Sequence, residues 1–265
     1  MEILKLLPKN ILSQVVGKLV NVGHPSALAL WARDWFIERY NIDMSEAEHS
    51  LEEYPTIAKL FTRKLKPGLR RIGEGFIHPC DGRLTHAEKF SYDNLIQAKG
   101  KKYSLSKLLA DTSSAQIFAD GTQFTYYLCP TDYHRVHSPV TGQVTRLVYV
   151  PGHLWPVNEW SVQNIDELFS VNERLIFHFQ TLRGPVALVM VGATNVGKIT
   201  VSFDPKIVTN SGLKAFTRTY KTPVEVKKGE EIGVFNMGST VVVIYSRDMV
   251  KKLPQFGPVK MGESL

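Results

Sequence analysis

The sequence predicts an α+β protein whose body is predominantly antiparallel β-sheet, of the sandwich or barrel-sandwich kind, with amphipathic helices at its N-terminal end. Three observations lead to this fold class. Helical periodicity is confined to the first sixty-odd residues, and from about residue 70 the apolar residues alternate or form short unbroken runs. No glycine-rich phosphate loop follows a strand and begins a helix, which argues against a doubly wound parallel sheet.

Four local signals predict the helices. Apolar residues recur on one face over 11–20, and Pro25 suits the first turn of a second helix. Ser45–Glu48 has the form of a capping box. Pro55 can begin a further short helix that runs to about residue 61.

The N-terminal helices have two interpretations. Trp31, Trp35 and the basic residues around them suit helices that lie at a membrane interface. Packing on the body is the simpler alternative, and the residues alone slightly favour it. No membrane-spanning helix is expected, because lysines and prolines interrupt the apolar stretches well before the roughly 20 residues that a span needs. A secretory signal is not expected either.

Two kinds of pattern predict the strands of the body. Continuous apolar runs at Val186–Val191 and Val241–Ile244 suit strands that are buried on both faces. Apolar and polar residues alternate over three further stretches, 124–128, 175–179 and 199–203. One short helix is expected near Ser104 to Leu109.

The composition limits the class of protein and its partners. Of the 265 residues 43% are hydrophobic and 22% charged, which excludes disordered, collagen-like and coiled-coil chains. With 32 Lys and Arg against 25 Asp and Glu, the net charge of +7 favours an anionic partner: nucleic acid, an acidic membrane surface or a phosphate-bearing substrate. No motif of stacking aromatics on a basic strand supports nucleic acid. Two cysteines, Cys80 and Cys129, cannot form a disulfide scaffold, so a reducing compartment is expected.

Three short clusters of polar residues could carry chemistry. They are His78–Gly82, Thr131–Pro139 and Asn236–Thr240. Taken singly, each has an ordinary structural explanation, such as a turn that leads into a strand. A metal site is poorly supported, because no second cluster with ligand spacing completes one. The candidate catalytic side chains in the clusters are Asp81, Asp132, His134, His137 and Ser239.

Together the clusters supply an acid, a histidine and a hydroxyl, which are the parts of a triad that activates a nucleophile. The serine of a hydrolase usually sits at a sharp strand-to-helix elbow, whereas Ser239 enters a strand after a single glycine. This placement leaves little room for an acyl group from solution and puts the Ser239 Oγ beside the Gly238 carbonyl. The nearest electrophile is therefore the backbone of the chain itself. A conventional Ser-His-Asp hydrolase and a non-catalytic β-sandwich binding module remain the alternatives.

The spaced combination of motifs resembles the phosphatidylserine decarboxylases of the bacterial or mitochondrial type, which carry a self-generated pyruvoyl group. The resemblance extends along most of the chain. The blocks that carry it are Phe61–Gly68, His78–Gly82, Tyr133–His137, Gly152–Asn158, Asn172–Arg174, Val191–Gly197, Lys228–Gly233 and Gly238–Thr240.

This resemblance implies the reaction and its prosthetic group. The chain would cleave itself between Gly238 and Ser239 and then decarboxylate phosphatidylserine to phosphatidylethanolamine and CO2, a step of phospholipid biosynthesis. The electron sink would be a covalent pyruvoyl group derived from Ser239, with no metal and no pyridoxal phosphate.

The resemblance also implies a role for each candidate side chain. Asp81 would orient His137, which takes the proton from Ser239 Oγ so that the oxygen attacks the Gly238 carbonyl. In the mature enzyme His134 would position the substrate carboxylate or assist protonation of the product. Asp132 would support the pair of histidines.

The same resemblance implies how the protein is organised. Residues 1–66 would form a helical membrane-associating segment and residues 67–265 a β-rich catalytic domain. Cleavage would leave a large chain, 1–238, and a small chain, 239–265, which form a heterodimer. Two such heterodimers would form a homodimer. The expected partners are phosphatidylserine and an anionic membrane surface, not nucleic acid, and the expected location is the cytoplasmic face of a bacterial cell membrane. The resemblance thus favours the membrane-facing interpretation of the N-terminal helices.

Overall fold

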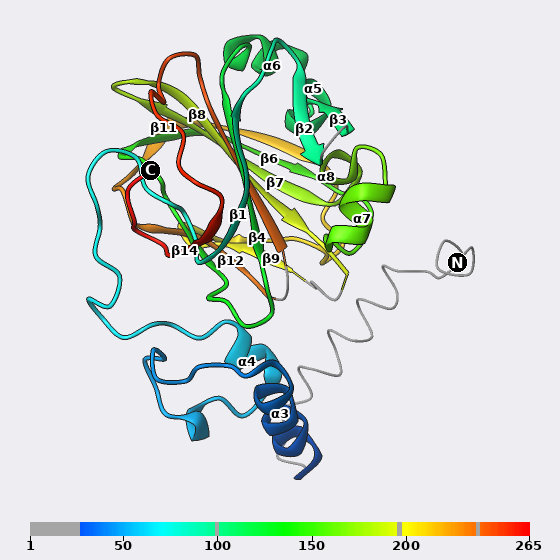
Figure 1. Ribbon diagram of the computed structural model, residues 1–265, viewed down its shortest axis with the longest axis vertical. Coiled ribbons are helices and arrows are strands. Elements are labelled where there is room, and N and C mark those ends of the chain that lie inside the picture. The colour runs from blue at the N-terminus through cyan, green and yellow to red at the C-terminus, as the bar shows by residue number, and fades with distance from the viewer. Residues whose placement is uncertain (1–26, 99–100, 195–197, 237–238) are drawn as a thin grey trace.

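A computed structural model of the chain describes residues 27–98, 101–194, 198–236 and 239–265. A small helical segment lies at one end of a larger β-rich body (Figure 1). The predicted helix over 11–20 lies outside the described residues. The helices are α3 (Ala27–Tyr40), a 3-10 turn η1 (Leu51–Glu53), α4 (Ile57–Phe61), α5 (Leu105–Leu109), α6 (Thr112–Phe118), α7 (Glu159–Asn164) and α8 (Leu168–Val171).

The body contains an eight-stranded sheet, a four-stranded sheet and a two-stranded hairpin, and all their named strand pairs are antiparallel. The eight-stranded sheet has the order β11 (Phe216–Val226), β6 (Gly142–Val150), β7 (Arg174–Thr181), β8 (Gly184–Gly192), β13 (Ser239–Tyr245), β4 (Thr122–Leu128), β1 (Gly82–Lys89), β14 (Gly257–Val259). The four-stranded sheet has the order β10 (Asp204–Val208), β9 (Ile199–Val201), β12 (Glu231–Phe235), β5 (Arg135–His137). The hairpin pairs β2 (Asn94–Ala98) with β3 (Lys101–Ser104).

The predicted α+β class with an antiparallel β body is confirmed. The apolar run of β13 lies between β4 and β8, and every residue of this strand is buried. Such a strand must be apolar on both faces, because neither face reaches water. Each Val or Ile that it buries contributes about 1.5–3 kcal/mol of transfer free energy.

The turn at Asp81–Gly82 requires a glycine. Gly82 has a φ of +150°, and a Cβ atom at this position would lie 2.6 Å from the carbonyl oxygen of Tyr127 on β4. Only glycine adopts this backbone without that clash. The turn therefore leads Asp81 directly into the end of β1, next to β4.

The capping box expected at Ser45–Glu48 is wrong. The Ser45 N–H binds the Asp43 carboxylate at 2.8 Å, and Ala47 forms an isolated β-bridge with Leu65. A short acidic side chain that binds the backbone two residues later favours a turn over a helix, and this contact prevails here. The shorter helices are confirmed: Thr56 caps α4 and Ser104 caps α5, each through its side-chain oxygen.

Helix α3 exposes much of its apolar surface. Trp31 and Trp35 are 63% and 50% exposed, whereas Phe36 packs into a small core with residues of α4. Arg33 is buried instead, and donates to the carbonyl oxygens of Leu51 and Tyr54. Within the described part of the chain, no helix combines the length and the apolar character that crossing a membrane requires.

Candidate active site

The candidate residues converge at one end of the strands of the eight-stranded sheet. Ser239, the first residue of β13, pairs with Leu128 on one side and Gly192 on the other. Arg83 pairs with Tyr127, which places Asp81 beside the same end of β4. The segment that contains both candidate histidines leaves β4 directly after Leu128. The antiparallel register thus brings the three sequence clusters together, although about 50 residues separate the first from the second and about 100 the second from the third.

Ser239 is fully buried, and its Oγ has no hydrogen-bond partner among the described residues. A buried hydroxyl without a partner is uncommon, because it loses its hydrogen bonds to water without replacing them. The serine begins a central strand and does not sit at the elbow that hydrolases use. Gly238, the other residue of the expected cleavage site, lies outside the described residues.

His137 is held as a neutral base. Its Nδ1 lies 2.8 Å from the Gly229 carbonyl oxygen, which can only accept, so this nitrogen carries the proton. Its Nε2 then carries the lone pair and accepts a hydrogen bond from the Tyr133 hydroxyl at 3.0 Å. Burial lowers the pKa of His137 below its ordinary value. The ring is therefore unprotonated at neutral pH, with a basic nitrogen available.

His134 is buried without access to water. Its Nδ1 lies 2.8 Å from the Asp132 carbonyl oxygen, and its Nε2 has no partner among the described residues. The ring packs against Phe61 of α4, with the centroids 3.9 Å apart. Burial lowers the pKa of His134 to about 3, so this imidazole is also neutral.

Asp132 closes the turn that carries these histidines. Its carboxylate accepts the Cys129 N–H at 2.7 Å, and its own N–H binds the Cys129 carbonyl oxygen. Burial raises the pKa of Asp132. The contact with His134 is made by the backbone carbonyl of Asp132, so the carboxylate supports the histidine only by shaping the turn.

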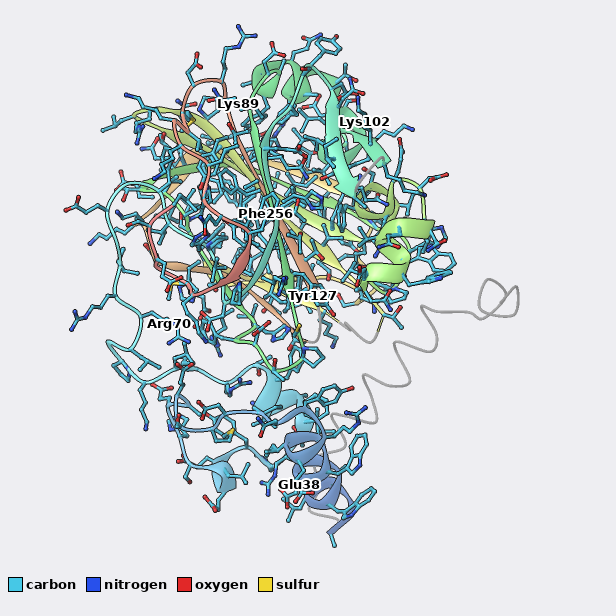
Figure 2. The ribbon with its side chains drawn as sticks, viewed as in Figure 1. Glu38, Arg70, Lys89, Lys102, Tyr127 and Phe256 are labelled. Atoms are coloured by element: carbon cyan, nitrogen blue, oxygen red, sulfur yellow. The ribbon has the colours of Figure 1, made fainter. Side chains whose placement is uncertain are left out.

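Asp81 is buried and lies at the centre of a cluster of charges that extends to the surface. Its carboxylate receives two hydrogen bonds from Arg70, at 3.1 and 2.5 Å, one from Lys260 at 3.2 Å and one from the Met261 N–H at 2.8 Å. Arg70 also binds Glu46. Burial alone raises the pKa of Asp81, but these partners outweigh it and the net pKa is lowered. Arg70 lies where the chain passes from the helical segment to the β body (Figure 2).

Asp81 was expected to orient His137, and among the described residues no hydrogen bond joins the two side chains. Both ring nitrogens of His137 have other partners, and all the hydrogen bonds of the Asp81 carboxylate go to Arg70, Lys260 and Met261. A backbone hydrogen bond joins the His78–Gly82 and Thr131–Pro139 clusters instead. The His137 N–H donates to the Pro79 carbonyl oxygen at 2.8 Å. Among the described residues, no hydrogen bond joins the Ser239 Oγ to either histidine; the histidine segment follows β4, the strand that pairs with Ser239, and so starts from the same end of the sheet.

Sequence reasoning missed several residues of the site. Tyr133 precedes His137 by four residues inside the quoted motif, but nothing in the pattern assigned it a role. Asn172 donates to the carbonyl oxygen of Gly192, the register partner of Ser239, at 2.9 Å. Gly229 acts through its backbone carbonyl, which no side-chain motif can reveal. Both cysteines are free thiols, and no group of three or more His, Cys, Asp and Glu in the described ranges could hold a metal ion.

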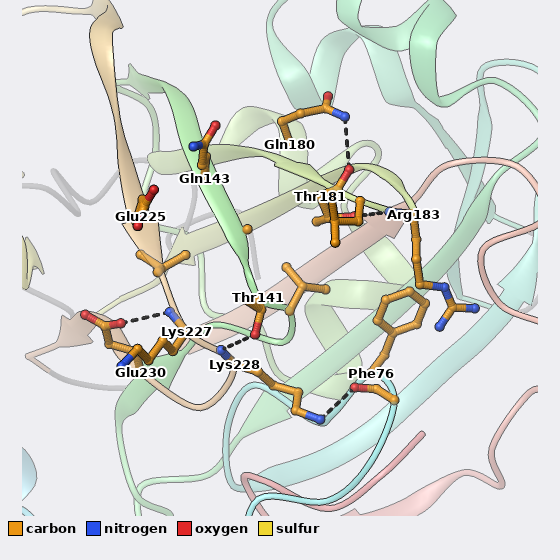
Figure 3. Close-up of a pocket in the computed structure, with 15 residues that line it drawn as sticks. Phe76, Thr141, Gln143, Gln180, Thr181, Arg183, Glu225, Lys227, Lys228 and Glu230 are labelled. Carbon is orange, nitrogen blue, oxygen red and sulfur yellow. Dashed lines mark hydrogen bonds between the residues drawn. The ribbon is translucent and has the colours of Figure 1, made fainter.

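Two large cavities lie on the β body. One, of about 750 Å³, is bordered by Phe76, Arg183 and the Lys227–Glu230 turn (Figure 3). It lies beyond the Tyr245 end of β13, where Gly184 begins β8, about 20 Å along the strands from Ser239. The other, of about 730 Å³, is bordered by Arg83, Tyr127 and Thr240, the residue that follows Ser239. Only the second cavity adjoins the candidate serine.

Comparison with known proteins gives one consistent result. A family model described as phosphatidylserine decarboxylase matches residues 57–265. A phosphatidylserine decarboxylase proenzyme of Myxococcus xanthus (strain DK1622) is 41% identical over 271 residues, covering 100% of this chain and 96% of that protein. Proteins with the same name from Anaeromyxobacter sp. (strain K) and Shewanella woodyi (strain ATCC 51908 / MS32) are 43% and 40% identical, covering 99% and 92% of this chain and 95% and 88% of theirs.

Proposed function

The chain belongs to the phosphatidylserine decarboxylase family, and from this premise we infer that it is a proenzyme that cuts itself and then decarboxylates phosphatidylserine. The products of the reaction are phosphatidylethanolamine and CO2. The cut falls between Gly238 and Ser239 and gives a large chain of 238 residues and a small chain of 265 − 238 = 27 residues.

The buried, unpartnered Oγ of Ser239 is the observation that carries this proposal. In the uncut chain a serine in this position is closed to a substrate from solution, but it is adjacent in the chain to the Gly238 carbonyl. The residues present therefore suit a prosthetic group that is made from residue 239 itself. When formed, a pyruvoyl group at this position supplies the ketone that accepts the electrons released with CO2.

We propose that His137 is the base of the cleavage. Its Nε2 takes the Ser239 proton as Oγ attacks the Gly238 carbonyl carbon, and the C–N bond between the two residues breaks to leave an ester and a free amine. Loss of the Cα proton of residue 239 then expels the Gly238 carboxylate and leaves a dehydroalanine. Addition of water and loss of ammonia convert it to pyruvoyl. The Gly229 carbonyl keeps Nδ1 protonated and thus keeps Nε2 basic.

Asp81 acts on His137 through its charge and not through a hydrogen bond. Burial lowers the pKa of His137, and the Gly229 carbonyl, the Glu231 carboxylate and, to the smallest extent, Asp81 oppose it. The Asp81 charge thus makes a minor contribution to stabilising the imidazolium that forms when the ring takes a proton. Asp81 also binds Lys260 and the Met261 N–H, which both belong to the small chain. We infer that this carboxylate helps to keep the two chains together after the cut.

In the mature enzyme we assign the substrate-side role to His134. Its low pKa keeps the ring neutral, and its unpartnered Nε2 can accept a hydrogen bond at the same end of the sheet as residue 239. Asp132 supports it by closing the turn that orients the ring.

Residues 1–66 are proposed to hold the catalytic domain, residues 67–265, at the surface of an anionic membrane on the cytoplasmic side. The exposed Trp31 and Trp35 of α3 suit the level of the lipid headgroups. The net charge of +7 adds attraction to acidic lipids. The helical segment contacts the β body through Arg63. This side chain donates to the Thr131 carbonyl oxygen, beside the candidate histidines.

An assay of phosphatidylserine labelled in its serine carboxyl carbon tests the proposed function. The wild-type protein is expected to release labelled CO2 and to form phosphatidylethanolamine. Ser239→Ala should remain uncut and release no CO2, because it lacks the attacking oxygen. Ser246→Ala is the matched control: this serine lies just after β13, donates to Met249 and should be cut and active. An uncut Ser239→Ala protein that still released CO2 would contradict the proposal.

A further inference from the structure

The cavity of about 730 Å³ beside Thr240 is formed over the outer face of the eight-stranded sheet. Arg83 pairs with Tyr127, and Tyr127 pairs with Thr240, so these three residues form one cross-strand row. Residues directly opposite each other in antiparallel strands point to the same face. The row lies one residue from Ser239 along β13 and borders the cavity. Successive side chains of a strand point to opposite faces, so the cavity reaches residue 239 from the backbone end of β13 and not from the side of its Oγ.

Arg83 provides an unused positive charge in this cavity. Its side chain is exposed, and in the part of the chain that the structure describes it has no ion pair, hydrogen bond or aromatic partner. The comparable surface arginines Arg218 and Arg247 each pair with an aspartate. Arginine presents a planar set of donors that binds phosphate in a bidentate manner. Glu159 of α7 is the other charged group on the wall, and His86, also on the wall, has a pKa that burial lowers.

The rest of the wall combines an apolar side with uncharged polar side chains such as Thr85, Thr125 and Gln163. Val157, Val162 and Phe169 cover one side, and the 63% exposed Phe256 lies at the rim. A cavity of this size suits a small-molecule ligand, with a few polar groups that fix its orientation. Tyr127 lies at one end of this wall, and burial raises its pKa. Figure 2 shows Tyr127 at the end of the body nearest the helical segment.

We propose that this cavity binds the glycerophosphoserine part of the lipid, with Arg83 as its phosphate-binding residue. Two strand spacings, about 10 Å, separate β1 from β13. An extended arginine side chain and a phosphoserine headgroup can together span this distance, so a phosphate at Arg83 leaves the serine amine within reach of residue 239. The apolar side of the wall then receives the first methylenes of the acyl chains. This inference rests on the proposed function and specifies how the substrate is recognised.

Kinetics with monomeric dihexanoyl phosphatidylserine, below its micelle concentration, test the assignment without a membrane. Arg83→Ala is expected to cut itself normally and to keep kcat within about 2-fold, while KM rises about 10-fold or more, as for loss of a hydrogen bond to a charged group. A serine O-alkyl ether, which lacks the phosphate, should react equally with the wild type and the variant. Arg247→Ala removes the same charge at the far end of β13 and should leave both substrates unaffected.

Three results would overturn the assignment. They are an unchanged KM for the soluble lipid, a KM that rises with vesicles only, and an equal loss on the phosphate-free substrate. The second result would mean that Arg83 binds the membrane surface, and the third would mean that Arg83 has only a structural role. If Arg83→Ala does not mature, Arg83→Gln, which keeps most of the side-chain volume, is measured in the same way. Failure of the proposed function itself is distinguishable, because the wild-type protein would then release no CO2.

Discussion

At the scale of single residues, the chemistry of Ser239 depends on backbone groups as much as on side chains. The Gly229 carbonyl fixes the tautomer of His137, and the Asp132 carbonyl does the same for His134. Both histidines are kept neutral mainly by burial. A neutral imidazole of fixed tautomer is what a general base requires, and it is obtained here without a hydrogen-bonded carboxylate.

The pH dependence of cleavage tests the role of His137. Uncut chain, prepared in denaturant and refolded by dilution at different pH values, is followed on denaturing gels. Cleavage should be independent of pH near neutrality and slow only as the pH falls below the ordinary histidine value of about 6.5, because the pKa of His137 is lowered. His137→Gln should slow cleavage by about 100-fold or more.

Tyr133→Phe is the matched variant for this experiment. It keeps the base but removes the hydroxyl that donates to Nε2, a contact that favours the unprotonated ring. The pKa of His137 should therefore rise, and cleavage should begin to slow at a higher pH than in the wild type. A Tyr133→Phe profile that coincides with the wild-type profile, or full cleavage in His137→Gln, would exclude this role.

The sequence predicts which residues belong to the site better than it predicts their contacts. The Asp81, His137 and Ser239 clusters were recognisable because each has an unusual local pattern. The partners of Asp81 were not recognisable in the sequence, because Arg70 precedes Asp81 by 11 residues and Lys260 follows it by 179. Such contacts depend on how β1 and β14 pair, and no local pattern encodes this pairing.

At the scale of elements, the strands were predictable where burial alone sets the pattern. The runs that become β8 and β13 are apolar because both faces of the central strands are covered. Helix α3 is different, because its helical character was recognisable but its orientation was not. Arg33 takes a buried position and the tryptophans remain outside, an arrangement that depends on carbonyl groups of the following turn.

Membrane binding tests the function of α3. Replacement of Trp31 and Trp35 by Ser should reduce sedimentation with phosphatidylserine-containing vesicles, because the helix loses the aromatic groups suited to the interface. Activity on the soluble short-chain substrate should remain. Leu182→Ser is the control, since Leu182 is fully exposed in the turn between β7 and β8 and far from α3. Unchanged sedimentation of the tryptophan variant would remove the membrane role of this helix.

At the scale of the whole molecule, buried histidines make the fold sensitive to acid. Burial lowers the pKa of His78 to about 4 and of His178 and His134 to about 3. In the unfolded chain histidine titrates near 6.5. Between these values the unfolded chain binds protons that the folded chain does not, so the free energy of unfolding falls as the pH is lowered from about 6.5 to about 4.

Denaturant titrations of the uncut Ser239→Ala chain measure this effect on a single polypeptide. Each of the three histidines should contribute a loss on the order of 1 kcal/mol per pH unit across that window. His178 is remote from the site and contacts Arg146. His178→Gln should therefore reduce the slope of the free energy of unfolding against pH by one such contribution. The same slope in the variant and its parent would show that His178 does not contribute to the pH dependence of the free energy of unfolding.

Self-cleavage that converts Ser239 to a pyruvoyl group is the central claim, and the intact mass of the freshly purified wild-type protein tests it most directly. The prediction is two chains, 1–238 and 239–265, whose masses add up to the mass of the precursor plus one water and minus one ammonia. The small chain should have no free amino group at its N-terminus. A single uncut chain, or two chains whose masses add up to the precursor plus water alone, as ordinary proteolysis gives, would contradict the account.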